Sequence, residues 1–107
     1  MIINMKTKKV LINKLWVVYV LRCRDDTLYT GITNNIEKRL IAHDRGMAAK
    51  YTRSRRPLVL SAVSDSMSRT DAMRLEIKIK KLAKEKKIST LKMYAKKKGK
   101  SGAKNIS

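Results

Sequence analysis

Two short apolar segments joined by a polar turn most constrain the fold of this chain. Residues 16–23, WVVYVLRC, are rich in Val, Leu and Tyr, which is typical of a buried β-strand, and the polar residues RDDT follow them. Residues 28–33, LYTGIT, form a second strand pattern, so the two segments predict an antiparallel hairpin. Each strand carries a tyrosine, Tyr19 or Tyr29. The second strand also contains Gly31, and a glycine inside a strand usually marks the close approach of another group.

The length of the hairpin loop decides whether the two tyrosines share a face of the sheet. Side chains alternate between the faces of a strand, and residues that pair across the ladder lie on the same face. A two-residue loop would put Tyr19 and Tyr29 on opposite faces. A three-residue loop at residues 24–26 would pair Tyr19 with Gly31 and put both rings on one face. The glycine opposite Tyr19 would then leave space above that residue. A shared site requires the three-residue loop, and the sequence leaves both lengths open.

The segment that follows the hairpin predicts an amphipathic helix. Asn34 is a favourable N-cap, and Glu37 follows three residues later, as in a capping box. Ile36 and Leu40 would form its apolar stripe, and Gly46 is a stop signal. We therefore expect a helix that begins after Asn34 and ends at Gly46.

The second half of the chain predicts one more strand and two more helices. Residues 47–57 are typical of a basic loop, and residues 58–63 of a strand. A helix is expected to begin near Ser68, with Asp71 three residues later, and the residues that would face the sheet are Ala72, Leu75, Ile79 and Leu82. A further short helix would turn three side chains inward, those of Ile88, Leu91 and Tyr94. The order β-β-α-β-α-α predicts an α+β fold, in which helices flank a small three-stranded antiparallel sheet.

The composition of the two ends predicts that they lie outside the folded domain. Residues 1–14 are a basic N-terminal extension, and residues 96–107, KKKGKSGAKNIS, are expected to form a flexible lysine-rich tail. Residues 15–95 are therefore the expected domain. Cys23 is the single cysteine, so no disulfide can form within the chain. No segment has the apolar length of a membrane span or the pattern of a signal peptide, which favours a cytoplasmic location.

The net charge is the strongest indication of function. The chain carries 27 Lys and Arg against 8 Asp and Glu, a net charge of +19 on 107 residues. Such self-repulsion is costly unless a polyanion is the partner, and it is the electrostatic pattern of a nucleic-acid-binding domain. No helix pattern is apolar on one face and basic on the other, so a membrane surface is disfavoured as the partner.

Five short motifs, all in register, resemble those of the GIY-YIG nucleases. VVY at residues 17–19 and YTG at residues 29–31 are similar to the two signatures of that superfamily, with both tyrosines kept. The resemblance continues through NNIEKRLIAH, KYTRSRRP and RLEIKIKKL, and it covers about residues 15–90. The second signature also reads YTG in the small single-domain bacterial branch, the URI-type endonuclease domains. The resemblance implies a phosphodiester hydrolase of this type.

The resemblance also implies roles for individual residues. Tyr19 and Tyr29 would orient or deprotonate the attacking water, and either could be the general base. Arg39 would stabilise charge on the scissile phosphate, and His43, four residues later on the same helix face, would assist by hydrogen bonding or proton transfer. Tyr51 would contact the phosphate or its water network, and the gap at Gly31 would let the phosphate approach the sheet.

A metal ion and a set of basic contacts complete the implied site. Glu76 would be the sole protein ligand of one divalent ion, Mg²⁺ or Mn²⁺, which suits an ion that keeps most of its waters. The residues expected to contact the nucleic-acid backbone are Lys38, Lys50, Arg53, Arg55, Arg56 and Lys80. Many relatives carry a lysine directly after the second glycine, where this chain has Ile32, and Lys38 or Lys50 could supply that charge.

Three functions remain open from the sequence. The favoured one is a metal-dependent nuclease that acts on DNA rather than RNA, with little sequence specificity, in repair or in the processing of branched structures. The second is a non-catalytic nucleic-acid-binding module with the same fold. The third is a structural RNA-associated protein, which the lysine-rich ends favour and the ordered set of tyrosine, arginine and glutamate does not.

Overall fold

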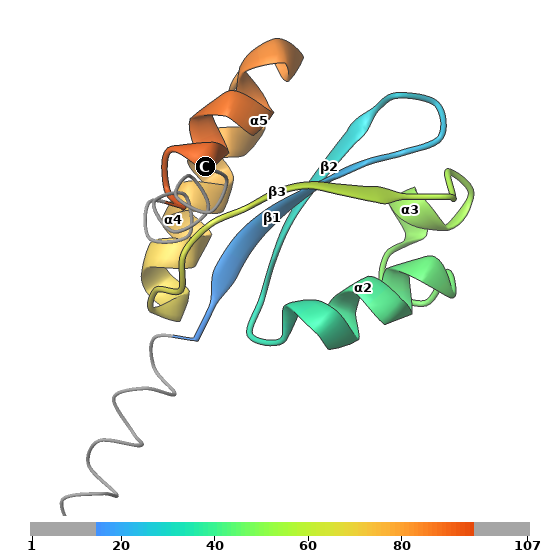
Figure 1. The fold of residues 1–107 in the computed structure, drawn as a ribbon, viewed down its shortest axis with the longest axis horizontal. Coiled ribbons are helices and arrows are strands. Elements are labelled where there is room, and N and C mark those ends of the chain that lie inside the picture. Colours follow the sequence, from blue (N-terminus) through green and yellow to red (C-terminus); the bar gives the residue numbers. More distant parts are fainter. Residues whose placement is uncertain (1–14, 96–107) are drawn as a thin grey trace, which may run out of the picture.

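The computed structural model describes residues 15–95, so the predicted N-terminal extension and C-terminal tail lie outside the described residues. The elements are β1 (Val17–Arg22), β2 (Leu28–Thr33), α2 (Ile36–Asp44), α3 (Lys50–Arg53), β3 (Val59–Val63), α4 (Arg69–Lys80) and α5 (Lys84–Lys92). The three strands form one antiparallel sheet in the order β2-β1-β3. Helices α4 and α5 lie on one side of it and α2 and α3 on the other (Figure 1). The predicted α+β fold and the order of its main elements are confirmed.

The hairpin between β1 and β2 has the three-residue loop. Tyr19 pairs with Gly31 and Leu21 with Tyr29, so both tyrosine side chains lie on the same face of the sheet. The ladder closes where the Cys23 amide donates to the Thr27 carbonyl at 2.8 Å. Asp26, the third residue of the loop, has a φ of 70°. This is the left-handed conformation that such three-residue loops require.

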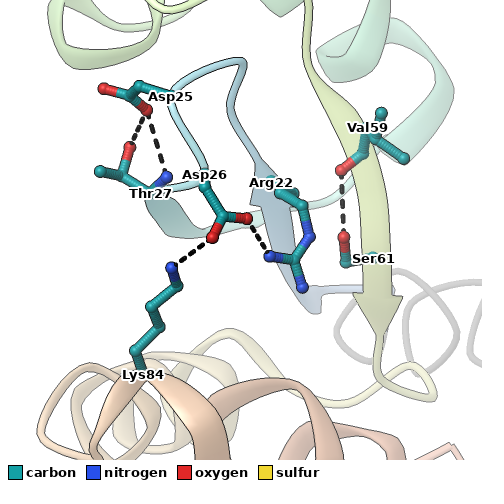
Figure 2. A network of polar contacts seen from close by, with 7 residues as sticks. All are labelled: Arg22, Asp25, Asp26, Thr27, Val59, Ser61 and Lys84. Carbon is teal, nitrogen blue, oxygen red and sulfur yellow. Dashed lines mark hydrogen bonds and ion pairs between the residues drawn. The ribbon is translucent and has the colours of Figure 1, made fainter.

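An ion-pair network connects the loop between β1 and β2 to α5. Figure 2 shows the Asp26 carboxylate between the guanidinium of Arg22 and the ammonium group of Lys84, which lies 2.8 Å away. Lys84 is the first residue of α5, so the network joins the loop to a helix far along the chain. On the same loop, the Asp25 carboxylate accepts hydrogen bonds from the hydroxyl and the amide of Thr27.

The hydrophobic core lies between the sheet and the pair α4 and α5. Val18 and Val20 of β1 are fully buried against residues of both helices. The predicted inward face of α4 is confirmed, because Ala72, Leu75 and Ile79 are buried. Leu82, the last residue predicted for that face, follows the end of α4 and is partly buried against the same core. On α5, Leu91 is buried and Ile88 is partly buried, and Tyr94, just after the helix, is partly buried too. Within residues 15–95, no helix is long and apolar enough to cross a membrane.

Three local predictions are wrong. The N-cap of α2 is Asn35 rather than Asn34, because the Asn35 side chain accepts the Lys38 amide while its own amide donates to the Thr33 hydroxyl. With this cap, Glu37 does not stand at the position of a capping box. Strand β3 begins one residue later than predicted, at Val59. Finally, the expected basic loop contains the four-residue helix α3.

Candidate active site

The ring of Tyr19 lies across the backbone of Gly31. A Cβ atom at Gly31 would stand 2.7 Å from the Tyr19 Oη and 2.8 Å from its Cζ. The expectation that this glycine leaves an open space for a phosphate is therefore wrong, because the Tyr19 ring itself fills the space. Gly31 instead allows a large side chain from the paired strand to lie flat against the sheet.

Tyr19 is hydrogen-bonded to the one histidine of the chain. The Tyr19 Oη lies 2.8 Å from the His43 Nε2, and both side chains are about 1% exposed. The Tyr29 ring meets the His43 ring edge-on, with 5.2 Å between the centroids, and it lies 6.4 Å from the Tyr19 ring. Tyr51 stacks on Tyr29 at 6.0 Å and is 40% exposed. The four rings therefore form a cluster that runs from the buried pair Tyr19 and His43 out to the surface at Tyr51.

Burial and nearby charges favour the neutral forms of both Tyr19 and His43 near neutral pH. Burial raises the pKa of Tyr19 well above its ordinary value near 10, and the charges of Tyr29 and Glu76 raise it further while Arg39 opposes them. Burial also lowers the pKa of His43 from 6.5, and the positive charge of Arg39 lowers it again. Arg39 and Glu76 thus act on the cluster from two different helices, α2 and α4.

Glu76 is the carboxylate that could hold a metal ion at this cluster. Its side chain is 22% exposed, and its Oε2 lies 3.3 Å from the Lys80 ammonium group. In the part of the chain that the structure describes, no group of three or more His, Cys, Asp or Glu residues is arranged to hold a metal ion. A zinc site needs several protein ligands, whereas Mg²⁺ is commonly held by one or two carboxylates together with water and substrate phosphates. A single carboxylate therefore fits Mg²⁺ or Mn²⁺.

A hollow of about 280 Å³ opens beside the cluster. Its walls include Tyr29 and Tyr51 together with Lys80 and Lys87. Lys87 also donates to the carbonyls of Ile79 and Lys80 and so caps the end of α4. The exposed end of the ring cluster therefore meets basic side chains.

Sequence comparison identifies the family. The family model described as "GIY-YIG catalytic domain" matches residues 15–89. The chain belongs to the GIY-YIG family. The matched range contains every residue of the cluster, and membership places the domain among nuclease domains whose substrate is nucleic acid.

Relatives of this GIY-YIG chain include UPF0213 proteins of several organisms. A UPF0213 protein of Nitratidesulfovibrio vulgaris is 46% identical over 79 residues, which cover 74% of this chain and 72% of that protein. A UPF0213 protein of Natronomonas pharaonis is 50% identical over 70 residues, 65% of this chain and 82% of that one. The solution NMR structure of the UPF0213 protein BH0048 from Bacillus halodurans is 37% identical and superposes with a TM-score of 0.46, covering 75% of this chain and 85% of that one. None of these names states an activity.

The arginines expected to contact nucleic acid also hold the GIY-YIG domain together. Arg53 donates to the Gly46 carbonyl, and Arg56 donates to the carbonyls of Arg53 and Asp44. Arg55 covers the Tyr51 ring, with its Cζ 3.9 Å from the ring centroid. Its guanidinium also donates to the Asp25 carboxylate and to the Tyr51 carbonyl. The loop around α3 is therefore anchored by its own arginines.

The structure separates the two lysines that were considered for the missing charge at Ile32. The Ile32 side chain packs against the core. Lys50 is exposed at the start of α3, and Lys38 lines a different hollow, of about 310 Å³, together with Arg39. Lys80, which was expected to contact the nucleic-acid backbone, is the lysine that lies beside both Glu76 and Tyr29.

Sequence reasoning missed Thr52. Its side chain is fully buried, and its hydroxyl lies 2.9 Å from the His43 Nδ1. It stands in the segment that was expected to be a basic loop, where an isolated threonine carries no pattern that indicates burial. Only the folded position of α3 beside α2 brings Thr52 to the histidine.

Proposed function

We propose that this chain is a metal-dependent endonuclease that hydrolyses phosphodiester bonds of DNA with little sequence specificity, in DNA repair or in the processing of branched structures. The observation that carries the proposal is the hydrogen bond between Tyr19 and His43 inside a cluster that Arg39 and Glu76 influence from two sides. Phosphodiester hydrolysis needs a route for the proton of the attacking water and positive charge for the phosphate. This cluster offers both.

The Tyr19–His43 pair is assigned the proton transfer. Because its pKa is raised, Tyr19 does not ionise on its own near neutral pH. His43 is neutral there because its pKa is lowered, so its Nε2 can take the phenol proton while the Tyr19 Oη takes a proton from the attacking water. The hydroxide then forms the new P–O bond as the bond from phosphorus to the leaving oxygen breaks, and the leaving oxygen takes a proton from solvent. His43 returns its extra proton to Tyr19, which releases one proton to solvent. Tyr29, nearer the surface, orients the water.

Arg39 and Glu76 are assigned the stabilisation of the negative charge on the phosphate. Arg39 would neutralise negative charge that builds up on the phosphate oxygens. Glu76 would hold the divalent ion, which when bound supplies Lewis-acid stabilisation to the phosphate and the leaving oxygen. Lys80, beside Glu76, would contact a neighbouring phosphate. Such backbone contacts position the substrate without reading its sequence.

A cleavage assay with two glutamate variants tests the proposal. End-labelled single-stranded, duplex, flap and junction DNAs are incubated with the protein, with and without Mg²⁺ or Mn²⁺. We expect cleavage that requires the metal, that Glu76→Ala abolishes, and that Glu85→Ala, an exposed glutamate on α5, retains. Cleavage that persists in Glu76→Ala would contradict the metal assignment. If none of these DNAs is cleaved while binding is intact, the chain is a binding module.

The salt dependence of binding tests the contact with a polyanion separately. If the protein makes about 6 to 10 phosphate contacts, its affinity should fall roughly 10³- to 10⁵-fold between 50 and 200 mM salt. Fluorescence anisotropy with the Glu76→Ala variant and labelled DNA measures this fall without cleavage. A flat response would exclude the backbone contacts assigned to the lysines.

A further inference from the structure

The hydroxyl of Thr52 makes two contacts that together fix the direction of a hydrogen-bond chain. Its Oγ1 donates to the Ala49 carbonyl at 3.2 Å and lies 2.9 Å from the His43 Nδ1. A hydroxyl has one proton, and a carbonyl can only accept. Since the Thr52 proton goes to Ala49, the contact with His43 needs the proton of the imidazole. This arrangement requires the hydrogen on Nδ1.

The opposite ring nitrogen is then the acceptor. A neutral imidazole has one N–H, so a protonated Nδ1 leaves a lone pair on Nε2. That lone pair faces the Tyr19 Oη at 2.8 Å, and the phenol donates to it. The chain of donors runs from Tyr19 to His43, from His43 to Thr52 and from Thr52 to the Ala49 carbonyl, with one acceptor for each proton.

We propose that Thr52 is a positioning residue that holds His43 in the Nδ1–H tautomer and so keeps Nε2 available for the Tyr19 proton. Thr52 is 0% exposed and His43 1%, so bulk water does not replace the hydroxyl as the partner of Nδ1. The other tautomer would turn an N–H toward Tyr19 and break the alignment of all three bonds. The effect on cleavage rests on the proposed function, whereas the tautomer itself does not.

The placement of Thr52 depends on α3, which is anchored at several points. Arg53, the next residue, donates from its side chain to the Gly46 carbonyl and from its amide to the Ala49 carbonyl. Arg55 ties the end of the same segment to the hairpin loop through Asp25. The short helix therefore holds the threonine hydroxyl against the imidazole from a fixed direction.

NMR of the imidazole nitrogens tests the tautomer directly. The chain has one histidine, so a long-range ¹H–¹⁵N spectrum of untagged protein, recorded where His43 is neutral, contains the signals of this ring alone. We expect Nδ1 at the shift of a protonated nitrogen and Nε2 at the shift of an unprotonated one. The reverse pattern in the wild-type protein would overturn the proposal without any variant.

Two variants of Thr52 test its role. Thr52→Val keeps the shape and removes the hydroxyl, so the population should move toward the Nε2–H tautomer. Thr52→Ser keeps the hydroxyl and should keep the wild-type spectrum. Single-turnover cleavage should fall by about tenfold or more in Thr52→Val and recover in Thr52→Ser, as part of the roughly 10²- to 10⁴-fold that a positioned acid–base group contributes.

The outcomes separate this inference from the proposed function. A folded Thr52→Val protein with an unchanged tautomer would overturn the role of Thr52. If Thr52→Val does not fold, the wild-type spectrum still decides the tautomer, and Thr52→Ala, which removes the same hydroxyl with a smaller side chain, decides its dependence on the hydroxyl. If the tautomer shifts as expected but no form of the protein cleaves nucleic acid, the proposed function fails while the tautomer assignment stands.

Discussion

Replacing Gly31 with alanine tests how Tyr19 packs across β2. The new Cβ would stand 2.7 Å from the Tyr19 Oη, whereas ordinary contacts begin at 3.4 Å, so the ring must move by about 0.7 Å. The ring has little freedom to move, because it is about 1% exposed and its hydroxyl is bonded to His43. The substitution should therefore strain the core and weaken that hydrogen bond.

The expected loss of stability follows from three contributions. Overpacking a buried position costs about 1–3 kcal/mol, and a weakened hydrogen bond costs about 1 kcal/mol more. Replacing glycine within a strand normally gains about 0.5–1 kcal/mol, which opposes these losses. We expect Gly31→Ala to lower the free energy of unfolding by about 1–3 kcal/mol, with a fall in Tm of roughly 4–8 °C for each kcal/mol.

Urea unfolding monitored by Trp16 fluorescence measures the change, because the chain has one tryptophan and it packs against the core. The control is the same substitution in a Tyr19→Leu background, where the clash is removed and the cost of alanine should shrink. A double-mutant cycle gives the coupling between the two positions. If Gly31→Ala is as stable as the wild-type protein, or if the two changes are additive, the packing of Tyr19 against Gly31 is wrong.

Three further changes test other parts of the structure. Because burial and Arg39 lower the pKa of His43 below 6.5, the unfolded chain binds the extra proton first. The free energy of unfolding that is present above pH 6.5 should therefore decline as the pH falls toward the folded-state pKa of His43. Urea unfolding measured at several pH values should show a weaker pH dependence for His43→Gln than for the wild-type protein, and equal pH dependence would refute the lowered pKa of His43. Arg56→Gln removes the donors to the Arg53 and Asp44 carbonyls and should cost about 1–2 kcal/mol, whereas the exposed Arg45→Gln should be near neutral; equal urea midpoints would contradict the anchoring role. Ser68→Ala removes the N-cap bond to the Asp71 amide and should cost about 1 kcal/mol in thermal melts, with the exposed Ser66→Ala as control; matching melts would argue against the cap.

The sequence predicted the sheet and the main helices because their patterns are local. Apolar alternation and spacing identified the strands and the buried face of α4, where Ala72, Leu75 and Ile79 are buried as expected. The hairpin register could not be chosen from the sequence pattern, because the same residues are compatible with a two-residue and a three-residue loop. The left-handed φ of Asp26 selects the longer loop. At the start of α2 two adjacent asparagines could both cap, and the bond to Thr33 selects the second.

The site could be predicted only as far as its residues carry motifs. Tyr19, Tyr29 and His43 were expected in one place, and their rings do form one cluster. Thr52 was not predicted, because its role depends on a hydrogen bond between two helices rather than on any spacing along the chain. The filling of the space over Gly31 by the Tyr19 ring also depends on a rotamer that no sequence pattern gives.

Single-turnover cleavage by Tyr19→Phe tests the central claim most directly. This variant keeps the ring over Gly31 and removes only the hydroxyl that is bonded to His43. The matched control is Tyr94→Phe, which removes a hydroxyl that is bonded to Lys78 on α4. With Mg²⁺ and a DNA substrate that the wild-type protein cuts, Tyr19→Phe should cleave about 10²- to 10⁴-fold more slowly with unchanged DNA binding, while Tyr94→Phe keeps the wild-type rate. Equal rates for Tyr19→Phe and wild type would contradict the assignment of proton transfer to the Tyr19–His43 pair.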